Sequence, residues 1–284
     1  MNYLDFVDRI TQLNSEAVKI DLPHTEKKAP EIQPSKKNVL IFSPHPDDES
    51  ITGALALRLR KETQHQIINI PVTLGSDLKR RNERRQELEA ACAVLGFSIH
   101  DLLDSGLNKI SPDSQNINPQ KWNDDVEIIC DVIKQFDPVG IIFPHAEDLH
   151  PTHIGTNRLV FDALAGIVQT KPIMLFESEY WHPMQTPNLL LESSNQDVAL
   201  LIEAIACHHG EVNRTPYHLT QPSWMAENVR RGSEIMGTFG SNAVTFQFAT
   251  LYRKSSWYNG QSHKATKPLI VEQNHEDLAK LFDM

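Results

Sequence analysis

The chain has 284 residues, of which 40% are hydrophobic and 23% charged, as is ordinary for a globular protein with one large α/β domain or two small ones. A formal net charge of -10 without a basic stripe argues against nucleic acid or an anionic membrane as the main partner. The N-terminus lacks a basic stretch followed by an apolar run, and no apolar stretch suits a membrane span, so we expect a cytoplasmic protein.

Residues 1–37 are expected to form an arm in front of the main domain. Residues 3–14 mix apolar and polar side chains and are compatible with a short amphipathic helix. Residues 22–37 are polar and contain proline and lysine, which is typical of a linker. The main domain is therefore expected to begin at residue 38.

From residue 38 the sequence alternates between strand and helix patterns. Residues 39–42 form a continuous apolar run, which is typical of a buried parallel strand, and residues 49–62 have helical periodicity. Further strands are predicted at 67–74, 99–103, 139–143 and 173–176, and further helices at 79–95, 122–136 and 154–168. This alternation predicts an α/β fold, with a doubly wound, mostly parallel, Rossmann-like sheet and helices on both faces.

The pattern changes after Trp181. The elements predicted there are a strand at 189–191, helices at 197–208 and 224–235, and an edge strand within 244–252. From residue 255 the chain is polar, which predicts a loosely attached tail. One domain at 38–254 would then be followed by a tail at 255–284.

Two loops rich in histidine and carboxylate follow predicted strands. His45 to Glu49 come directly after the strand at 39–42, and His145 to His153 come after the strand at 139–143. In an open α/β sheet, ligands bind beyond the carboxyl ends of the strands. The two loops are therefore expected to meet in space, although they are far apart in the sequence.

The residue types in these loops suit a catalytic metal. Catalytic zinc commonly takes three protein ligands from histidine and carboxylate side chains and leaves a position for water. His45, Asp48 and His153 can supply such a set for Zn²⁺ or another divalent metal. Asp47 could then deprotonate the water. His150 could stabilise an oxyanion and protonate a leaving amine.

Each motif also has a simpler explanation when it is taken alone. Asp47 and Asp48 could merely cap the helix that follows, and His150 and His153 could be surface or core histidines. The three cysteines have no CxxC spacing and are expected to be buried thiols. Because GxGxxG, GxxxxGK[ST], GxSxG and HExxH are all missing, a metal is the remaining hydrolytic option.

The run from Ser43 to Glu49, SPHPDDE, resembles the PHPDDE motif of the LmbE-like, or PIG-L, zinc-dependent de-N-acetylases. Residues 74–96 are similar to the second strand and the Arg/Glu-rich helix of that family. Residues 144–153 resemble its second motif, which is usually HPDH. The likeness covers roughly residues 38–252, and the pair of motifs is quite specific.

The resemblance implies the same metal ligands, general base and catalytic histidine that the chemistry alone suggests. One position departs from the family, because Thr152 stands where an aspartate is common. That aspartate is expected to be a partner of the histidines, so its loss would change the pKa of His150. Asp148 or Glu147 could take its place.

Substrate-binding residues are expected outside the two loops. The residues assigned to this role are Arg84, His208, Glu211 and Arg230. Residues 207–211 fall where many family members have a histidine and a glutamine near a substrate loop. The segment 211–218 and the pair at 230–231 are expected to shape the pocket, and the alternative for both is helix surface and loop.

We therefore expect a zinc-dependent hydrolase that removes an acetyl or small acyl group from the amide nitrogen of an N-acetylated amino sugar or a related small molecule. One alternative is a metal hydrolase of the same fold that acts on a non-acetyl amide or an ester. Another is a non-catalytic sugar-binding relative. The resemblance also implies an N-acetylated sugar conjugate as the partner and allows a homo-oligomer.

Overall fold

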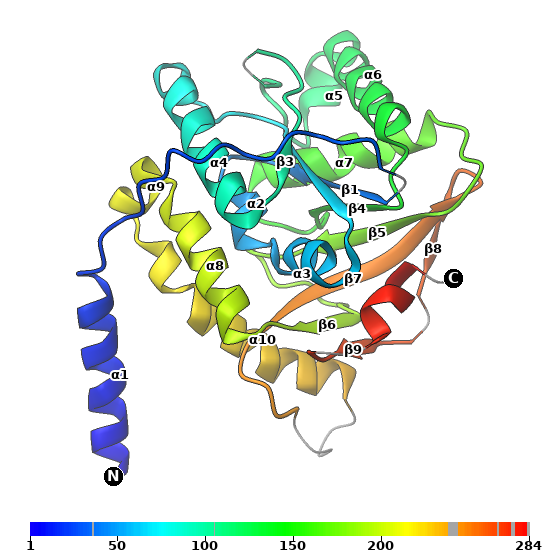
Figure 1. Cartoon of the computed structure of the whole chain (residues 1–284). Coiled ribbons are helices and arrows are strands. Elements are labelled where there is room, and N and C mark those ends of the chain that lie inside the picture. The colour runs from blue at the N-terminus through cyan, green and yellow to red at the C-terminus, as the bar shows by residue number, and fades with distance from the viewer. Residues whose placement is uncertain (36, 105, 238–243, 266, 274–275, 283–284) are drawn as a thin grey trace.

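The computed structural model describes residues 1–35, 37–104, 106–237, 244–265, 267–273 and 276–282. In this part of the chain, one nine-stranded sheet lies between layers of helices (Figure 1). The predicted α/β fold with a mostly parallel sheet and helices on both faces is confirmed.

The sheet has a parallel half and an antiparallel half. The strand order is β3-β2-β1-β4-β5-β7-β6-β9, and β8 pairs with β7. The parallel strands are β1 (Asn38–Ser43), β2 (Gln66–Pro71), β3 (Ser98–Ile99), β4 (Gly140–Pro144) and β5 (Ile173–Ser178). Because β1 lies between β2 and β4, the chain winds outward from it in both directions. Open α/β sheets bind ligands at such a point, beyond the carboxyl ends of the two strands.

The parallel strands are buried on both faces, which explains their continuous apolar sequences. In β1, Val39 and Ile41 belong to one core and Leu40 and Phe42 to the other. The first core is covered by α3 (Ala54–Thr63), α4 (Arg81–Leu95) and α8 (Asn195–Ala206). The second core is covered by α6 (Pro119–Phe136) and α7 (Pro151–Ala165).

The structure differs from the sequence expectation in the C-terminal part. The strand expected at an edge is β7 (Ala249–Tyr258), which lies between β5 and β6 (Leu189–Glu192) and is antiparallel to both. The expected loose tail is also corrected, because residues 255–258 continue β7. The later elements β8 (Gln261–Lys264), β9 (Leu269–Val271) and η3 (Glu276–Phe282) pack on the domain. η3 buries Leu278 and Leu281 in the first core, so apolar residues within a polar stretch attach it.

The N-terminal arm has two parts. The helix α1 (Tyr3–Ala17) is longer than expected and buries none of its residues. Further along, the backbone N–H of Gln33 donates to the side chain of Gln66 at 2.7 Å, and that side chain donates back to the Gln33 carbonyl at 2.8 Å. Leu22 packs against a small cluster that contains Ile51. The stretch after α1 is therefore attached to the domain rather than being a free linker.

Six further helical elements lie in the described part of the chain. They are α2 (Asp48–Ile51), η1 (Leu78–Arg80), α5 (Ser114–Ile117), α9 (His209–Arg214), η2 (Tyr217–Leu219) and α10 (Gln221–Met236). The single helix expected at 49–62 is divided into α2 and α3 at Thr52 and Gly53. A Cβ on Gly53 would lie 2.2 Å from the carbonyl oxygen of Glu49, so the break requires glycine. Among the described residues, no helix is both long and apolar enough to cross a membrane.

Candidate metal centre

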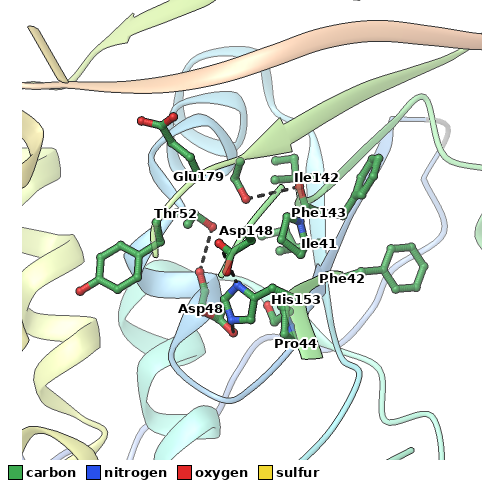
Figure 2. A pocket seen from close by; sticks show the side chains of 14 residues that line it. Ile41, Phe42, Pro44, Asp48, Thr52, Ile142, Phe143, Asp148, His153 and Glu179 are labelled. Atoms are coloured by element: carbon green, nitrogen blue, oxygen red, sulfur yellow. Dashed lines mark hydrogen bonds and ion pairs between the residues drawn. The ribbon is translucent and has the colours of Figure 1, made fainter. Parts of the chain in front are cut away.

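The two histidine- and carboxylate-rich loops lie beside each other at one edge of the sheet. Because β1 pairs in parallel with β4, the loops that follow them leave from neighbouring strand ends. α2 begins in the first loop and α7 in the second. Asp48, Asp148 and His153 point toward one another in a small pocket at these strand ends (Figure 2). The loops therefore meet as their positions in the sheet predict.

Asp48 lies between two histidines. Its Oδ2 is 3.4 Å from Nδ1 of His45 and 3.4 Å from Nε2 of His153. The buried Nε2 of His153 makes no hydrogen bond. Two ligand atoms that are each bonded at about 2.1 Å to a tetrahedral zinc ion are separated by about 3.4 Å. Both distances from Asp48 Oδ2 therefore fit ligand atoms that share a metal ion, and the same oxygen also accepts the backbone N–H of His45 at 2.9 Å.

The carboxylates around His153 favour a positive charge at this point. Burial by itself lowers the pKa of His153, but Asp48 and Asp148 outweigh burial and raise that pKa to about 10. Burial also acts to raise the pKa of Asp48, yet His153 and His45 hold it well below its ordinary value. The negative field that stabilises a proton on His153 would stabilise a divalent cation in the same place.

His150 completes a cluster of three histidines. The ligand atoms of His45, His150 and His153 all lie within 4.8 Å of one another, so the cluster could hold a metal ion. However, Nδ1 of His150 accepts a hydrogen bond from the backbone N–H of Thr152 at 3.2 Å. A neutral imidazole with an accepting Nδ1 carries its proton on Nε2. In this tautomer the His150 Nε2 is a hydrogen-bond donor and has no lone pair for a metal.

The surroundings of His150 also favour its neutral form. Burial and the nearby His45 and His153 lower the pKa of His150 to about 4, while Asp48 and Asp148 act in the opposite direction. The ring is therefore uncharged at neutral pH. A neutral Nε2–H beside His45 and His153 suits a hydrogen-bond donor to a substrate oxygen better than it suits a metal ligand.

Asp148 lies beside the histidines of the cluster. Its Oδ2 is 3.5 Å from Nδ1 of His153, and its Oδ1 accepts the backbone N–H of His150 at 2.8 Å. Glu147 instead lies 3.5 Å from the ring of His145 and is half exposed. Of the two carboxylates considered as substitutes, the structure brings Asp148 to the cluster.

Asp47 has an unusual backbone conformation and a carboxylate that is 15% exposed. Its φ of 126° and ψ of -29° are strained for a residue with a Cβ. Its side chain makes no capping hydrogen bond to α2, so capping does not explain this residue. Instead, Oδ2 accepts a hydrogen bond from the hydroxyl of Tyr217 at 2.7 Å and lies 3.9 Å from the guanidinium of Arg84.

The pKa of Asp47 is raised to about 6. The largest cause is burial, followed by the charge of Asp48, and the opposing effects come from His208, Arg84 and Tyr217. A carboxylate with this pKa is mostly ionised at neutral pH. Its pKa is also close to neutral pH, where a general base transfers protons efficiently. Asp47 is therefore suited to act as a general base.

Glu49 and His208 form a buried pair beneath Asp47. Oε1 of Glu49 lies 2.9 Å from Nε2 of His208, and both side chains are fully buried. Oε2 of Glu49 accepts the backbone N–H of Asp47 at 2.9 Å. Burial lowers the pKa of His208, but Glu49 and Asp47 outweigh burial and raise it. His208, which the sequence assigns to substrate binding, is thus placed where it supports the strained loop and cannot touch a substrate.

The other expected substrate-binding residues divide into two groups. Arg84 lies beside Asp47, and Glu211 lies on the other side of Arg84, with its Oε1 3.9 Å from Nε of Arg84. Arg230 is exposed on α10 and is bound by two glutamates of its own helix, so the structure does not bring it to the site. Its neighbour Arg231 is instead paired with Glu179, which lines the pocket.

Aromatic residues at the site were not singled out from the sequence. Trp181 is 55% exposed, its ring centroid lies 6.5 Å from that of His150, and it packs on Tyr180. Both aromatic residues follow β5, the strand next to β4, so the strand-end argument that located the two loops could have located them too. Tyr217 lies within the segment 211–218 that was expected to shape the pocket, but only the structure shows its bond to Asp47.

Several solved structures share this fold. A 4-carboxy-2-hydroxymuconate hydratase, GalB, from Pseudomonas putida KT2440 has a TM-score of 0.58 and 17% identity, covering 84% of this chain and 100% of that one. N,N'-diacetylchitobiose deacetylase from Pyrococcus horikoshii has a TM-score of 0.51 and 18% identity, covering 88% and 92%. A zinc-inhibited form of teicoplanin deacetylase Orf2 has a TM-score of 0.54 and 16% identity, covering 78% and 100%. At these identities the likeness shows the fold alone.

A comparison of the sequence with known families gives a match. No curated protein matches the chain. Residues 40–164 match the PIG-L family, which is described as GlcNAc-PI de-N-acetylase. This segment contains β1, β4 and both loops that form the histidine and carboxylate cluster. Within this segment, which is less than half of the chain, the predicted resemblance to the PIG-L family of de-N-acetylases is confirmed.

Proposed function

We propose that this protein is a metal-dependent N-deacetylase with His45, Asp48 and His153 as metal ligands. The observation that carries the proposal is the position of Asp48 Oδ2, 3.4 Å from a nitrogen of each histidine. Two imidazoles and one carboxylate are a common set for catalytic zinc and leave a site for water. When bound there, zinc would supply a Lewis acid for an acyl carbonyl and lower the pKa of water.

The neighbouring residues divide the remaining chemistry. Asp47, with a pKa of about 6, accepts the proton of the attacking water. The Nε2–H of His150 donates a hydrogen bond to the acyl oxygen, where negative charge develops. When the C–N bond breaks, the proton held by Asp47 passes to the amine nitrogen, so the products are a carboxylic acid and an amine.

The proposed substrate is an N-acetylated amino sugar or a related small molecule. The description of the family and two deacetylases among the structural neighbours support this substrate class. The exposed indole of Trp181 beside His150 offers a flat apolar surface at the mouth of the site, as a sugar ring requires. Because a hydratase shares the fold, the fold alone does not choose the reaction.

Metal analysis and an acetate-release assay on a panel of N-acetylated amino sugars test the proposal. Asp47→Asn should keep the metal and lower kcat/KM by about 10²- to 10⁴-fold, the range for loss of a general base. The matched control is Asp131→Asn, since Asp131 is 81% exposed on α6. It should behave as the wild type.

The same panel separates the other possibilities. Full activity of Asp47→Asn would contradict the mechanism. Turnover confined to non-acetyl amides or esters would favour the broader metal hydrolase, and sugar binding without turnover would favour a non-catalytic protein.

A further inference from the structure

The helix α1 has no partner within the described part of the chain. It extends away from the rest of the molecule in Figure 1, and none of its residues is buried. Its start is well defined, because Asn2 and Asp5 form both hydrogen bonds of a capping box at 2.9 and 3.0 Å. An isolated helix of this length is only marginally stable in water, so packing against another surface is expected to stabilise it.

Five apolar residues of α1 follow the spacing of a coiled-coil seam, and Val7 lies directly beside this seam. Tyr3, Phe6, Ile10, Leu13 and Ala17 are separated by alternating steps of three and four residues. This period of 3.5 residues defines the a and d positions of a heptad repeat. Four of these side chains are between 47% and 92% exposed, so the seam is free to pair.

We propose that α1 pairs with α1 of a second copy of this chain, in an antiparallel arrangement. In this register Ile10 of each copy faces Leu13 of the other at the centre. Phe6 of each copy faces Ala17 of the other, so that a large side chain meets a small one. A parallel pair would instead place Phe6 against Phe6 and Ala17 against Ala17. Two large side chains would then meet in one layer and two small ones in another.

Charged residues beside the seam favour the same orientation. Arg9 and Glu16 occupy the two g positions, and in an antiparallel pair the g residues of the two helices face each other. Arg9 of each copy then meets Glu16 of the other, which gives two complementary pairs. In a parallel pair Arg9 would face the uncharged Asn14. The macrodipoles of antiparallel helices are also opposed, which is favourable.

The attachment of α1 to the domain leaves room for this pairing. The chain joins the domain just after the C-terminal end of α1, where Leu22 packs near Tyr217 and His209 lies 2.8 Å from the carbonyl of Pro23. An antiparallel pair therefore places the two domains at opposite ends of helices about 22 Å long. A membrane is a less suitable partner, because the polar side of α1 carries Asp5, Asp8 and Glu16 and is not basic.

The mass of the full-length protein in solution, measured by sedimentation equilibrium, is the first test. The wild type should have twice the mass of one 32.2 kDa chain, and Ile10→Asp combined with Leu13→Asp should have the mass of one chain. Because α1 contributes nothing to the core, circular dichroism of the double variant should lose no more signal than α1 accounts for. A monomeric wild type, or a double variant that remains dimeric, would overturn the proposal.

Charge exchange tests the orientation. Arg9→Glu alone and Glu16→Arg alone should each weaken dimerisation by at least about tenfold, because each places like charges opposite each other twice. The combined variant should recover the wild-type dimer. Asp8→Arg is the matched control, since Asp8 lies on the side of the helix away from the seam.

Failure of the combined variant to recover would exclude the antiparallel register. If the protein is monomeric and needs α1 to sediment with phosphatidylcholine vesicles, the partner of α1 is a membrane and not a second copy. Neither result bears on acetate release, so this inference and the proposed function can fail separately.

Discussion

The two sides of the site are built differently. On the metal side, His45, Asp48 and His153 come from two loops within residues 40–164, and a nitrogen of each histidine ring lies 3.4 Å from Oδ2 of Asp48. On the base side, Asp47 is held by Tyr217 and by Glu49, which is paired with His208. The metal side thus brings together atoms that could hold an ion, whereas the base side holds one carboxylate in a strained conformation.

The two sides also differ in where the supporting residues come from. Tyr217, His208 and Glu211 all lie beyond residue 164, outside the segment that matches the family. The matched segment therefore contains the residues of the metal side, while several residues around the base come from the rest of the chain. Changes on the metal side should remove the metal, and changes on the base side should alter rate and pH dependence while the metal stays bound.

The largest effect is expected on removing the metal. Chelation should reduce acetate release to background, and added zinc should restore it. Zinc at one hundred times its dissociation constant should also raise the free energy of unfolding of the wild type by about 2.7 kcal/mol. The midpoint of thermal unfolding should rise with it. Asp48→Ala should abolish both responses, whereas Asp131→Asn should keep them. A wild type that is fully active after chelation would contradict a metal centre.

A smaller effect on the metal side is expected for Asp148→Asn. The variant keeps an oxygen for the backbone N–H of His150 but removes the charge that faces His153. Removing such a partner of a metal ligand typically weakens metal binding by about 10- to 100-fold. Isothermal titration with zinc measures the change, and Glu147→Gln is the control because Glu147 faces away from the cluster. Equal affinities for the two variants would show that Asp148 does not orient His153.

The smallest effect is expected on the base side, in the pH profile of kcat/KM. Because the pKa of Asp47 is raised to about 6 and its ionised form is the base, activity should be present above that pH and fall as the pH drops through it. Tyr217→Phe removes a hydrogen bond that favours the ionised form, so the acidic limb should move upward by up to about one pH unit.

Metal content separates this effect from one on the metal side. It should be unchanged in Tyr217→Phe, and Tyr258→Phe on β7 should leave the profile as it is. If the acidic limb of the kcat/KM profile moves to lower pH in Tyr217→Phe, Asp47 is not the group that titrates.

The strand patterns and the two loop motifs were sufficient to predict much of the site. A continuous apolar run such as Val39–Phe42 predicts a strand buried on both faces, and the loops after two such strands must leave from the same edge of a parallel sheet. Local pattern therefore determined the α/β fold and the meeting of His45, Asp48 and His153. It failed for β7, because a strand's neighbours depend on pairing with distant segments.

Only the tertiary structure decided the roles of the more distant residues. His208 and Arg230 are both polar residues in predicted helices, yet one is fully buried against Glu49 and the other is exposed among its own helix neighbours. The bond from Tyr217 to Asp47 likewise joins residues that no local pattern connects. The sequence by itself determined which residues could bind a metal, because donor type and strand-end position are local properties. Packing between segments far apart in the chain decides which residues support the two loops, hold Asp47 in its strained conformation and shift its pKa.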